Sequence, residues 1–262
     1  MTRKTEPRLL CYDLGEGVTA FSTTRHGGVS EANYASFNIN PYCGDSADHV
    51  ARNRQLLADR LGLPVSHIVL PHQVHGIEHR AVAPELLDMS DAVRDKILDG
   101  VDMVTTSMTG VCIGVSTADC IPVLLYDPVA RATAAIHAGW RGTLQRICQR
   151  AVMAMQLHYG TTPDRLRAVV GPGISLANFE VGQEVYDQFV QAGFDLTETA
   201  EWHTKWHLDL PGINIRELIG CGVAPEHIHH AGICTFDHAD DYFSARRLGI
   251  DSGRIYTGIL MR

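Results

Sequence analysis

The sequence lacks a hydrophobic run long enough to span a membrane, and residues 1–17 lack the apolar segment of a secretory signal. We therefore expect a cytoplasmic protein that has no membrane partner. The seven cysteines form no Cys-x-x-Cys pair, and their odd number argues against a disulfide framework. Most of them are expected to be buried thiols.

Basic residues are too few for a general nucleic-acid role. The 30 acidic and 22 basic side chains give a formal charge of -8, whereas neutralising phosphates requires a basic surface. The chain also lacks internal repeats at solenoid spacing and low-complexity linkers. Its 262 residues, 45% hydrophobic and 20% charged, predict one globular domain over residues 1–262.

The hydrophobic pattern predicts a mixture of strands and helices. A cap at Asp48 and a stop at Gly62 predict a helix ending near Leu61. Runs rich in β-branched residues predict strands at 68–70, 101–106, 111–116, 121–126, 132–137, 166–170 and 254–260. Further helices are expected after Gly142, at 183–192 and at 213–220, with a surface helix or excursion at 85–99. Because several strands adjoin directly, we predict an α+β fold, a single-domain layered sandwich with mixed β-sheets and flanking helices.

Three runs place histidine or cysteine where a hydrophobic stretch ends at Gly or Pro. They are His72-Gln73-Val74-His75-Gly76, Ala118-Asp119-Cys120-Ile121-Pro122 and His137-Ala138-Gly139-Trp140-Arg141-Gly142. One histidine of the first run, with Cys120 and His137, would give zinc three ligands and leave its fourth position open. Residues three apart can converge in a turn, but we expect only one of the two histidines to bind, and choose His75 over His72.

Arginines near these runs are candidates for binding an anion. Arg141 lies at the start of a predicted helix, where free backbone N–H groups favour phosphate. Arg25 precedes a Gly-Gly pair, which permits close backbone approach to a ligand. We predict that both bind phosphate, with structural salt bridges as the alternative. The roles of Arg246 and Arg247 are left open between the two.

Other polar residues allow a functional and a structural interpretation. Glu180 could serve as a catalytic base or only cap a helix. Four histidines near the carboxyl end could form a second metal site, but we predict only a polar loop; they are His227, His229, His230 and His238.

Six runs in order over nearly the whole chain carry a resemblance to a known family. They are Thr23-Thr24-Arg25-His26-Gly27-Gly28-Val29-Ser30, Gln73-Val74-His75-Gly76, Ala118-Asp119-Cys120-Ile121-Pro122-Val123, His137-Ala138-Gly139-Trp140-Arg141-Gly142, Phe179-Glu180-Val181-Gly182 and Phe243-Ser244-Ala245-Arg246-Arg247. They resemble the laccase-domain family, once described as multicopper polyphenol oxidoreductases and later as purine nucleoside phosphorylases with adenosine deaminase activity. Two positions depart from the pattern: Ala245 stands where an aromatic residue is expected, and His72 adds an imidazole.

The resemblance implies an α/β/α-type layered fold with mixed sheets and a mononuclear zinc or copper site at His75, Cys120 and His137. It implies purine nucleosides as substrates: adenosine, inosine and S-methyl-5'-thioadenosine. In phosphorolysis, the metal would polarise a water or a substrate oxygen while arginines position phosphate for attack at ribose C1'. In deamination, the same metal would activate water at adenine C6, with Asp119 as a candidate for proton transfer. The predicted catalytic residues are therefore Cys120, His137 and Asp119.

Three other classes of protein compete with this interpretation. A metal-free cysteine hydrolase or amidase would use Cys120 as nucleophile and His137 as base, which the same spacing allows. A copper-dependent polyphenol oxidase ranks lower, because multinuclear copper sites need more histidine ligands than one His-Cys-His set supplies. A binding module ranks last, because it gives no reason for a Cys-His set beside arginines.

Overall fold

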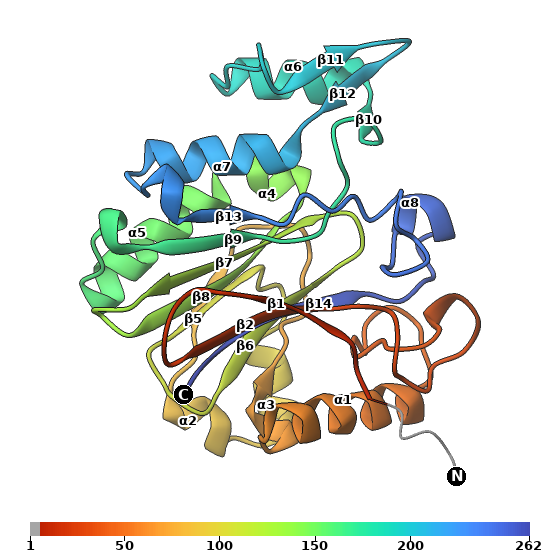
Figure 1. The fold of residues 1–262 in the computed structure, drawn as a ribbon, viewed down its shortest axis with the longest axis vertical. Coiled ribbons are helices and arrows are strands. Elements are labelled where there is room, and N and C mark those ends of the chain that lie inside the picture. The colour runs from red at the N-terminus through yellow and green to blue at the C-terminus, as the bar shows by residue number, and fades with distance from the viewer. Residues whose placement is uncertain (1–5) are drawn as a thin grey trace.

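The computed structural model describes residues 6–262. Residues 1–5, part of the 1–17 stretch expected to lack a secretory signal, lie outside the described residues. Two β-sheets pack face to face, and helices cover the outer face of each (Figure 1). Within residues 6–262 no helix is both long and apolar enough to cross a membrane.

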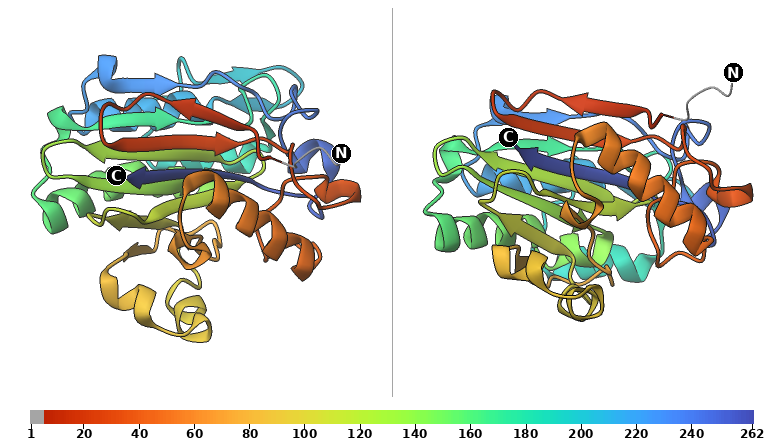
Figure 2. Two further views of the ribbon diagram at one scale, coloured as in Figure 1. Left: turned by 60° about the horizontal axis from the view of Figure 1, so that its bottom comes forward. Right: turned by 90° about the horizontal axis from the view of Figure 1, so that it is seen from below.

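The first sheet has five strands and mixed pairing. Its order is β1 (Leu9–Tyr12), β2 (Val18–Thr23), β14 (Ile255–Met261), β6 (Cys112–Thr117) and β3 (Ile68–Val69). Only β3 pairs in parallel, and the other neighbours are antiparallel. Helix α1 (Ala47–Leu61) lies across the outer face of this sheet (Figure 2). Its Leu57 and Leu61 pack there against Phe21 and Leu260.

The second sheet has six strands and is also mixed. Its order is β13 (Ile228–His230), β9 (Arg167–Val170), β7 (Ile121–Asp127), β8 (Ala132–Ala138), β5 (Met103–Thr106) and β4 (His79–Ala81). Three helices cover its outer face: α4 (Trp140–Leu144), α5 (Ile147–Tyr159) and α7 (Leu210–Gly220). The shorter helices α2 (Pro84–Asp88), α3 (Asp91–Ile97) and α8 (Ala245–Leu248) lie at the periphery.

A small third sheet lies beyond the helices of the second sheet (Figure 1). It is antiparallel, in the order β10 (Glu180–Val181), β12 (Trp206–Leu208) and β11 (Ala200–Trp202). Helix α6 (Gln183–Gln191) packs against it, with the Tyr186 and Trp206 rings stacked at 3.7 Å.

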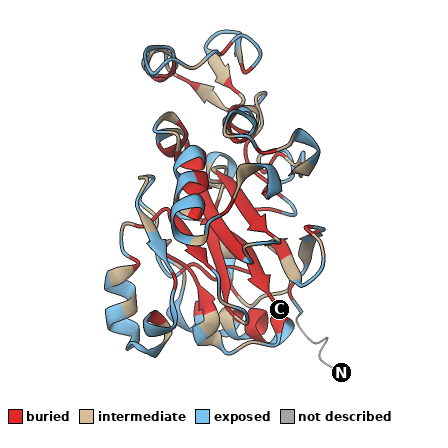
Figure 3. Cartoon of the chain, turned by 90° about the vertical axis from the view of Figure 1, so that its left-hand side faces the viewer, coloured by how far each residue is buried: buried red, intermediate tan, exposed pale blue. Residues whose placement is uncertain are grey.

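The central strands are buried on both faces, which explains their continuous apolar sequences (Figure 3). Side chains alternate between faces along a strand, so Val123 and Leu125 of β7 join the core under α5, while Leu124 joins the core between the sheets. The central strands therefore give the site a rigid base.

The structure confirms the predicted layered α+β sandwich with mixed sheets, and corrects three details. Helix α1 is preceded by Ser46 as its cap residue, so Asp48 lies in the first turn instead of capping the helix. The helix expected after Gly142 is two helices, α4 and α5, because Arg146 adopts a left-handed conformation (φ 60°) between them. The expected histidine loop contains strand β13, which pairs in parallel with β9.

Candidate metal centre

Sheet register brings Cys120 and His137 together. In the antiparallel pair of β7 and β8, Pro122 lies opposite His137, so Cys120, two residues before Pro122, lies at the end of β8. The third residue, His75, comes from the loop between β3 and β4. The predicted histidine, cysteine and second histidine therefore converge on one place at the end of the six-stranded sheet.

The geometry of this trio fits a metal ion. The candidate ligand atoms of His75, Cys120 and His137 all lie within 4.8 Å of one another, and no other such group of three occurs in the described chain. Ligands of a tetrahedral zinc ion lie about 3.4 to 3.8 Å apart, given bond lengths near 2.0 to 2.3 Å. Small side-chain movements would close the observed set around zinc. The histidine cluster at the carboxyl end forms no comparable group within residues 6–262.

Asp102, which is not among the predicted site residues, orients two of the three ligands. Its Oδ1 lies 2.6 Å from His137 Nδ1, which leaves Nε2 of that ring for a metal. The same carboxylate accepts backbone N–H groups from Val74 at 3.2 Å, His75 at 3.0 Å and Gly76 at 2.7 Å. A single buried carboxylate thus fixes the ring of one ligand and the backbone of another.

The loop that carries His75 is held in a conformation that non-glycine residues rarely adopt. His75 has φ 62°, in the left-handed region, where the cost is about 1 kcal/mol or more. Besides the bonds to Asp102, the Gln73 side chain pairs with the Ser116 backbone, at 2.9 Å to its oxygen and 2.7 Å from its nitrogen. These contacts hold the strained residue in place, as is common at functional sites.

Gly139 leaves room for the trio. A Cβ at this position would lie 3.1 Å from Cys120 Sγ, 3.1 Å from His75 Cδ2 and 3.8 Å from His137 Nε2. A larger residue would therefore crowd Cys120 and His75, so the glycine of the His-Ala-Gly-Trp run serves the site sterically.

Charges within the site stabilise a thiolate and an imidazolium when no metal is bound. Burial alone would raise the pKa of Cys120, but the charge and hydrogen bonding of His137 and His75 lower it to about 6. Burial alone would lower the pKa of His137, but Cys120 and Asp102 raise it to about 9. Burial would likewise raise the pKa of Asp102, and the bonds from His137 and the backbone lower it.

Alkylation of the metal-free protein should therefore show an acidic cysteine. We expect the rate at which iodoacetamide modifies Cys120 to rise with a midpoint near pH 6 instead of the ordinary 9.0, because the thiolate persists above the lowered pKa. Mass spectrometry of the Cys120 peptide measures this rate. In His137→Ala the midpoint should move up, and an unshifted midpoint near 9 in both proteins would disprove the thiolate–imidazolium pair.

Asp119 and His72 lie next to the trio but make other contacts. The Asp119 carboxylate accepts the Thr235 hydroxyl at 2.7 Å and the Arg246 backbone N–H at 2.7 Å, and so ties the loop of Cys120 to α8. His72 Nδ1 lies 2.6 Å from the exposed Asp99 carboxylate, and its ring stacks on Tyr42 at 4.3 Å. The carboxylate that orients a ligand histidine is that of Asp102.

The two arginines predicted to bind phosphate lie outside the wall of the cavity beside the trio. Arg25 is half-buried and donates to the carbonyl oxygens of Ala35 at 2.8 Å and Ala239 at 2.6 Å. Arg141 is exposed, with its guanidinium 4.3 Å from the centre of the Trp140 ring.

The remaining candidates make structural contacts at the surface. Glu180 forms an ion pair with Lys205 at 2.6 Å and lies in β10, not at a helix end. Arg246 donates to the Glu180 carbonyl at 3.2 Å, and Arg247 donates to the Phe236 carbonyl at 3.4 Å.

A cavity of about 220 Å³ opens beside the trio. Its wall includes His75, Cys120 and His137, three residues of the segment that precedes α1, and Ala245 of α8. The departure from the family pattern at Ala245 therefore falls in the wall of this cavity.

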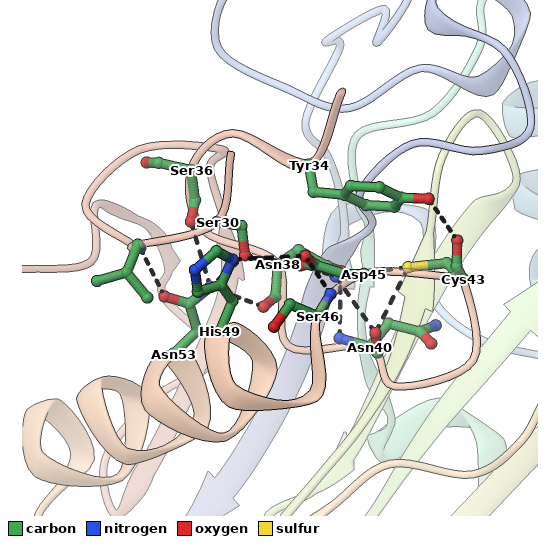
Figure 4. A network of polar contacts seen from close by, with 11 residues as sticks. Ser30, Tyr34, Ser36, Asn38, Asn40, Cys43, Asp45, Ser46, His49 and Asn53 are labelled. Atoms are coloured by element: carbon green, nitrogen blue, oxygen red, sulfur yellow. Dashed lines mark hydrogen bonds and ion pairs between the residues drawn. The ribbon is translucent and has the colours of Figure 1, made fainter. Parts of the chain in front are cut away.

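A buried polar network makes the segment that precedes α1 rigid (Figure 4). Asn53 of α1 donates to the Asn38 carbonyl at 2.8 Å, and Asn38 donates to Asp45 Oδ2 at 2.9 Å. From the same segment, Asn40 Nδ2 donates to Ser116 Oγ at 2.5 Å. Ser116 is also the residue whose backbone N–H donates to the Gln73 side chain. Helix α1 is thus connected to the loop of His75.

Comparison with known proteins agrees with this architecture. The family model of the multi-copper polyphenol oxidoreductase laccases matches residues 19–262. The chain belongs to this family. The resemblance predicted from the six runs is therefore confirmed. The solved structure of the hypothetical protein YfiH of Bacillus licheniformis matches with a TM-score of 0.91 and 28% identity, covering 99% of this chain and 98% of that one.

Two relatives that are similar in sequence to this laccase-family chain bear names from purine chemistry. A purine nucleoside phosphorylase of Bacteroides thetaiotaomicron is 44% identical over 247 residues, which cover 93% of this chain and 92% of the relative. Adenosine deaminase RL5, from an unknown prokaryotic organism, is 40% identical over 248 residues, covering 93% and 94%.

Proposed function

We propose that the protein is a cytoplasmic, metal-dependent purine nucleoside phosphorylase that also deaminates adenosine. The observation that carries the proposal is the His75, Cys120 and His137 set, oriented by Asp102 and open to a cavity. The names of the two relatives, each similar over more than nine tenths of this chain, support the purine substrates. The proposed substrates are adenosine, inosine and S-methyl-5'-thioadenosine, with inorganic phosphate.

His75, Cys120 and His137 would hold the ion, and zinc is the metal we propose because three such protein ligands leave its fourth tetrahedral position open for water or substrate. When bound, zinc supplies a Lewis acid that polarises a substrate oxygen. Asp102 keeps His137 in the tautomer that presents Nε2 to the ion. Tyr42, stacked on His72 in the cavity wall, offers an aromatic face for a purine.

Roles that the sequence predicts for three further residues stay predictions. The predicted proton-transfer group is Asp119, and the predicted phosphate ligands are Arg25 and Arg141. None of these three residues is among those that line the cavity. The contacts of Asp119 support a positioning role, because its carboxylate connects the Cys120 loop to α8.

Product analysis of the metal-loaded protein tests the proposal. We expect inosine to give hypoxanthine and ribose 1-phosphate only when phosphate is present, because phosphate is the proposed nucleophile. Adenosine should give adenine by phosphorolysis and inosine with ammonia by deamination, so chromatography separates the two reactions. Free ribose formed in phosphate-free buffer would instead identify a hydrolase, and no product from either nucleoside would overturn the assignment.

One observation favours a second function: Asp102 is hydrogen-bonded to His137, and His137 lies beside Cys120. A nucleophile, a base and a carboxylate that orients the base also make up the site of cysteine hydrolases. That enzyme would work without metal, so removing the metal with a chelator distinguishes the two. Amide hydrolysis that survives chelation, together with inactivity on nucleosides, would favour the cysteine hydrolase.

A further inference from the structure

The charge of the cavity wall differs from that of the whole chain. The protein carries a formal charge of -8, yet no aspartate or glutamate occurs among the described residues that line the cavity. The wall contains one arginine, Arg254, and no lysine within the described part of the chain. The cavity beside the trio is therefore locally suited to an anion.

Arg254 is held in place with donors to spare. Its guanidinium donates to the carbonyl oxygens of Ile250 at 2.9 Å and Gly253 at 3.0 Å, and to that of Ser252. Three of its five N–H groups are sufficient for these bonds, which leaves two for a ligand. No carboxylate within residues 6–262 lies within 4.0 Å of this guanidinium, since none of the ion pairs involves it.

The backbone of Arg254 is fixed by the polar network of Figure 4. Its N–H donates to Asn38 Oδ1 at 3.2 Å, and Asn38 is bonded in turn to Asp45 and Asn53. The Arg254 charge also acts on Cys43, another residue of the wall: burial raises the pKa of Cys43, and the guanidinium opposes that rise. A fixed, uncompensated cation therefore faces the small space that it shares with the trio.

We infer that Arg254 binds the phosphate co-substrate inside this cavity. The inference rests on the proposed function, and it assigns to Arg254 the role that the sequence predicts for Arg25 and Arg141. An oxygen of hydrogen phosphate forms a bond to ribose C1' while the C1'–N9 bond breaks. The electron pair of that bond goes to the purine, and the proton of hydrogen phosphate ends on the base. Arg254 holds the phosphate and takes no part in the proton transfer.

Steady-state kinetics of the metal-loaded protein test this assignment. In Arg254→Ala we expect the KM for phosphate to rise about 10- to 100-fold, as for loss of a charge-assisted contact, while the KM for inosine and the metal content stay unchanged. Arg254→Lys should recover only part of the affinity, because an ammonium cannot reproduce the planar fork. Arg52→Ala, which removes an exposed arginine of α1, is the matched control.

Two further measurements separate failure of this inference from failure of the proposed function. Deamination of adenosine needs no phosphate, so it should survive in Arg254→Ala and report an intact site. Calorimetry with inorganic phosphate alone measures the anion site even if no nucleoside is cleaved. Equal phosphate affinity in wild type and Arg254→Ala, or a rise in KM confined to Arg25→Ala or Arg141→Ala, would overturn the inference.

Discussion

Replacing Cys120 by alanine should remove the bound metal and the nucleoside cleavage together. The wild-type protein is expected to hold about one zinc ion per chain, and the variant close to none, because only two imidazoles remain. Since a metal ion supplies several kcal/mol to such reactions, cleavage of inosine should fall at least about a thousandfold. Elemental analysis after dialysis, followed by the inosine assay, measures both effects.

Matched variants show whether the loss is specific to the trio. Cys11→Ala removes an exposed thiol and should keep its metal. His75→Ala should lose the metal, whereas His72→Ala should keep it, because His72 pairs with Asp99 outside the trio. Full metal occupancy in Cys120→Ala would show that the assigned ligands are wrong.

Replacing Asp102 by asparagine should weaken metal binding about 10- to 100-fold, the usual effect of removing the partner of a ligand histidine. The amide cannot accept the same four donors, so the free energy of unfolding of the metal-free protein should also fall, by roughly 3 kcal/mol. A chelator titration and urea unfolding measure the two quantities.

Asp99→Asn is a close control for that experiment. Asp99 and His72 also lie 2.6 Å apart, but both side chains are exposed, at 65% and 40%. An exposed pair of this kind contributes less than about 1 kcal/mol. Equal effects of the two substitutions would mean that burial of Asp102 has no special importance.

The sequence predicted the elements whose pattern is local. The continuous apolar runs of β6 and β7 and the stop at Gly62 after α1 are readable without knowledge of neighbours. Strands β10 to β13 have two or three residues each and depend on distant partners, so no local period reveals them. The prediction of one domain over residues 1–262 stays a prediction.

The site residues also divide into those that local sequence reveals and one that only strand pairing reveals. His75, Cys120 and His137 were named because each stands at the end of a hydrophobic run near Gly or Pro, and the structure brings them together. Asp102 lies inside the predicted strand at 101–106 and is not among the predicted site residues. A carboxylate next to an apolar run was a usable signal, but only the pairing of β5 with β8 shows that it meets His137.

The position of the trio along the chain affects how the site can assemble during folding. Cys120 directly precedes β7 and His137 lies in β8 of the same hairpin, so two of the three ligands need only a contact between residues close in sequence. His75 joins them from a loop that requires β5 to dock beside β8, because Asp102 holds that loop. A partly folded chain with the hairpin alone would hold an ion by two ligands and exchange it readily, and tight binding would begin only when β5 is in place.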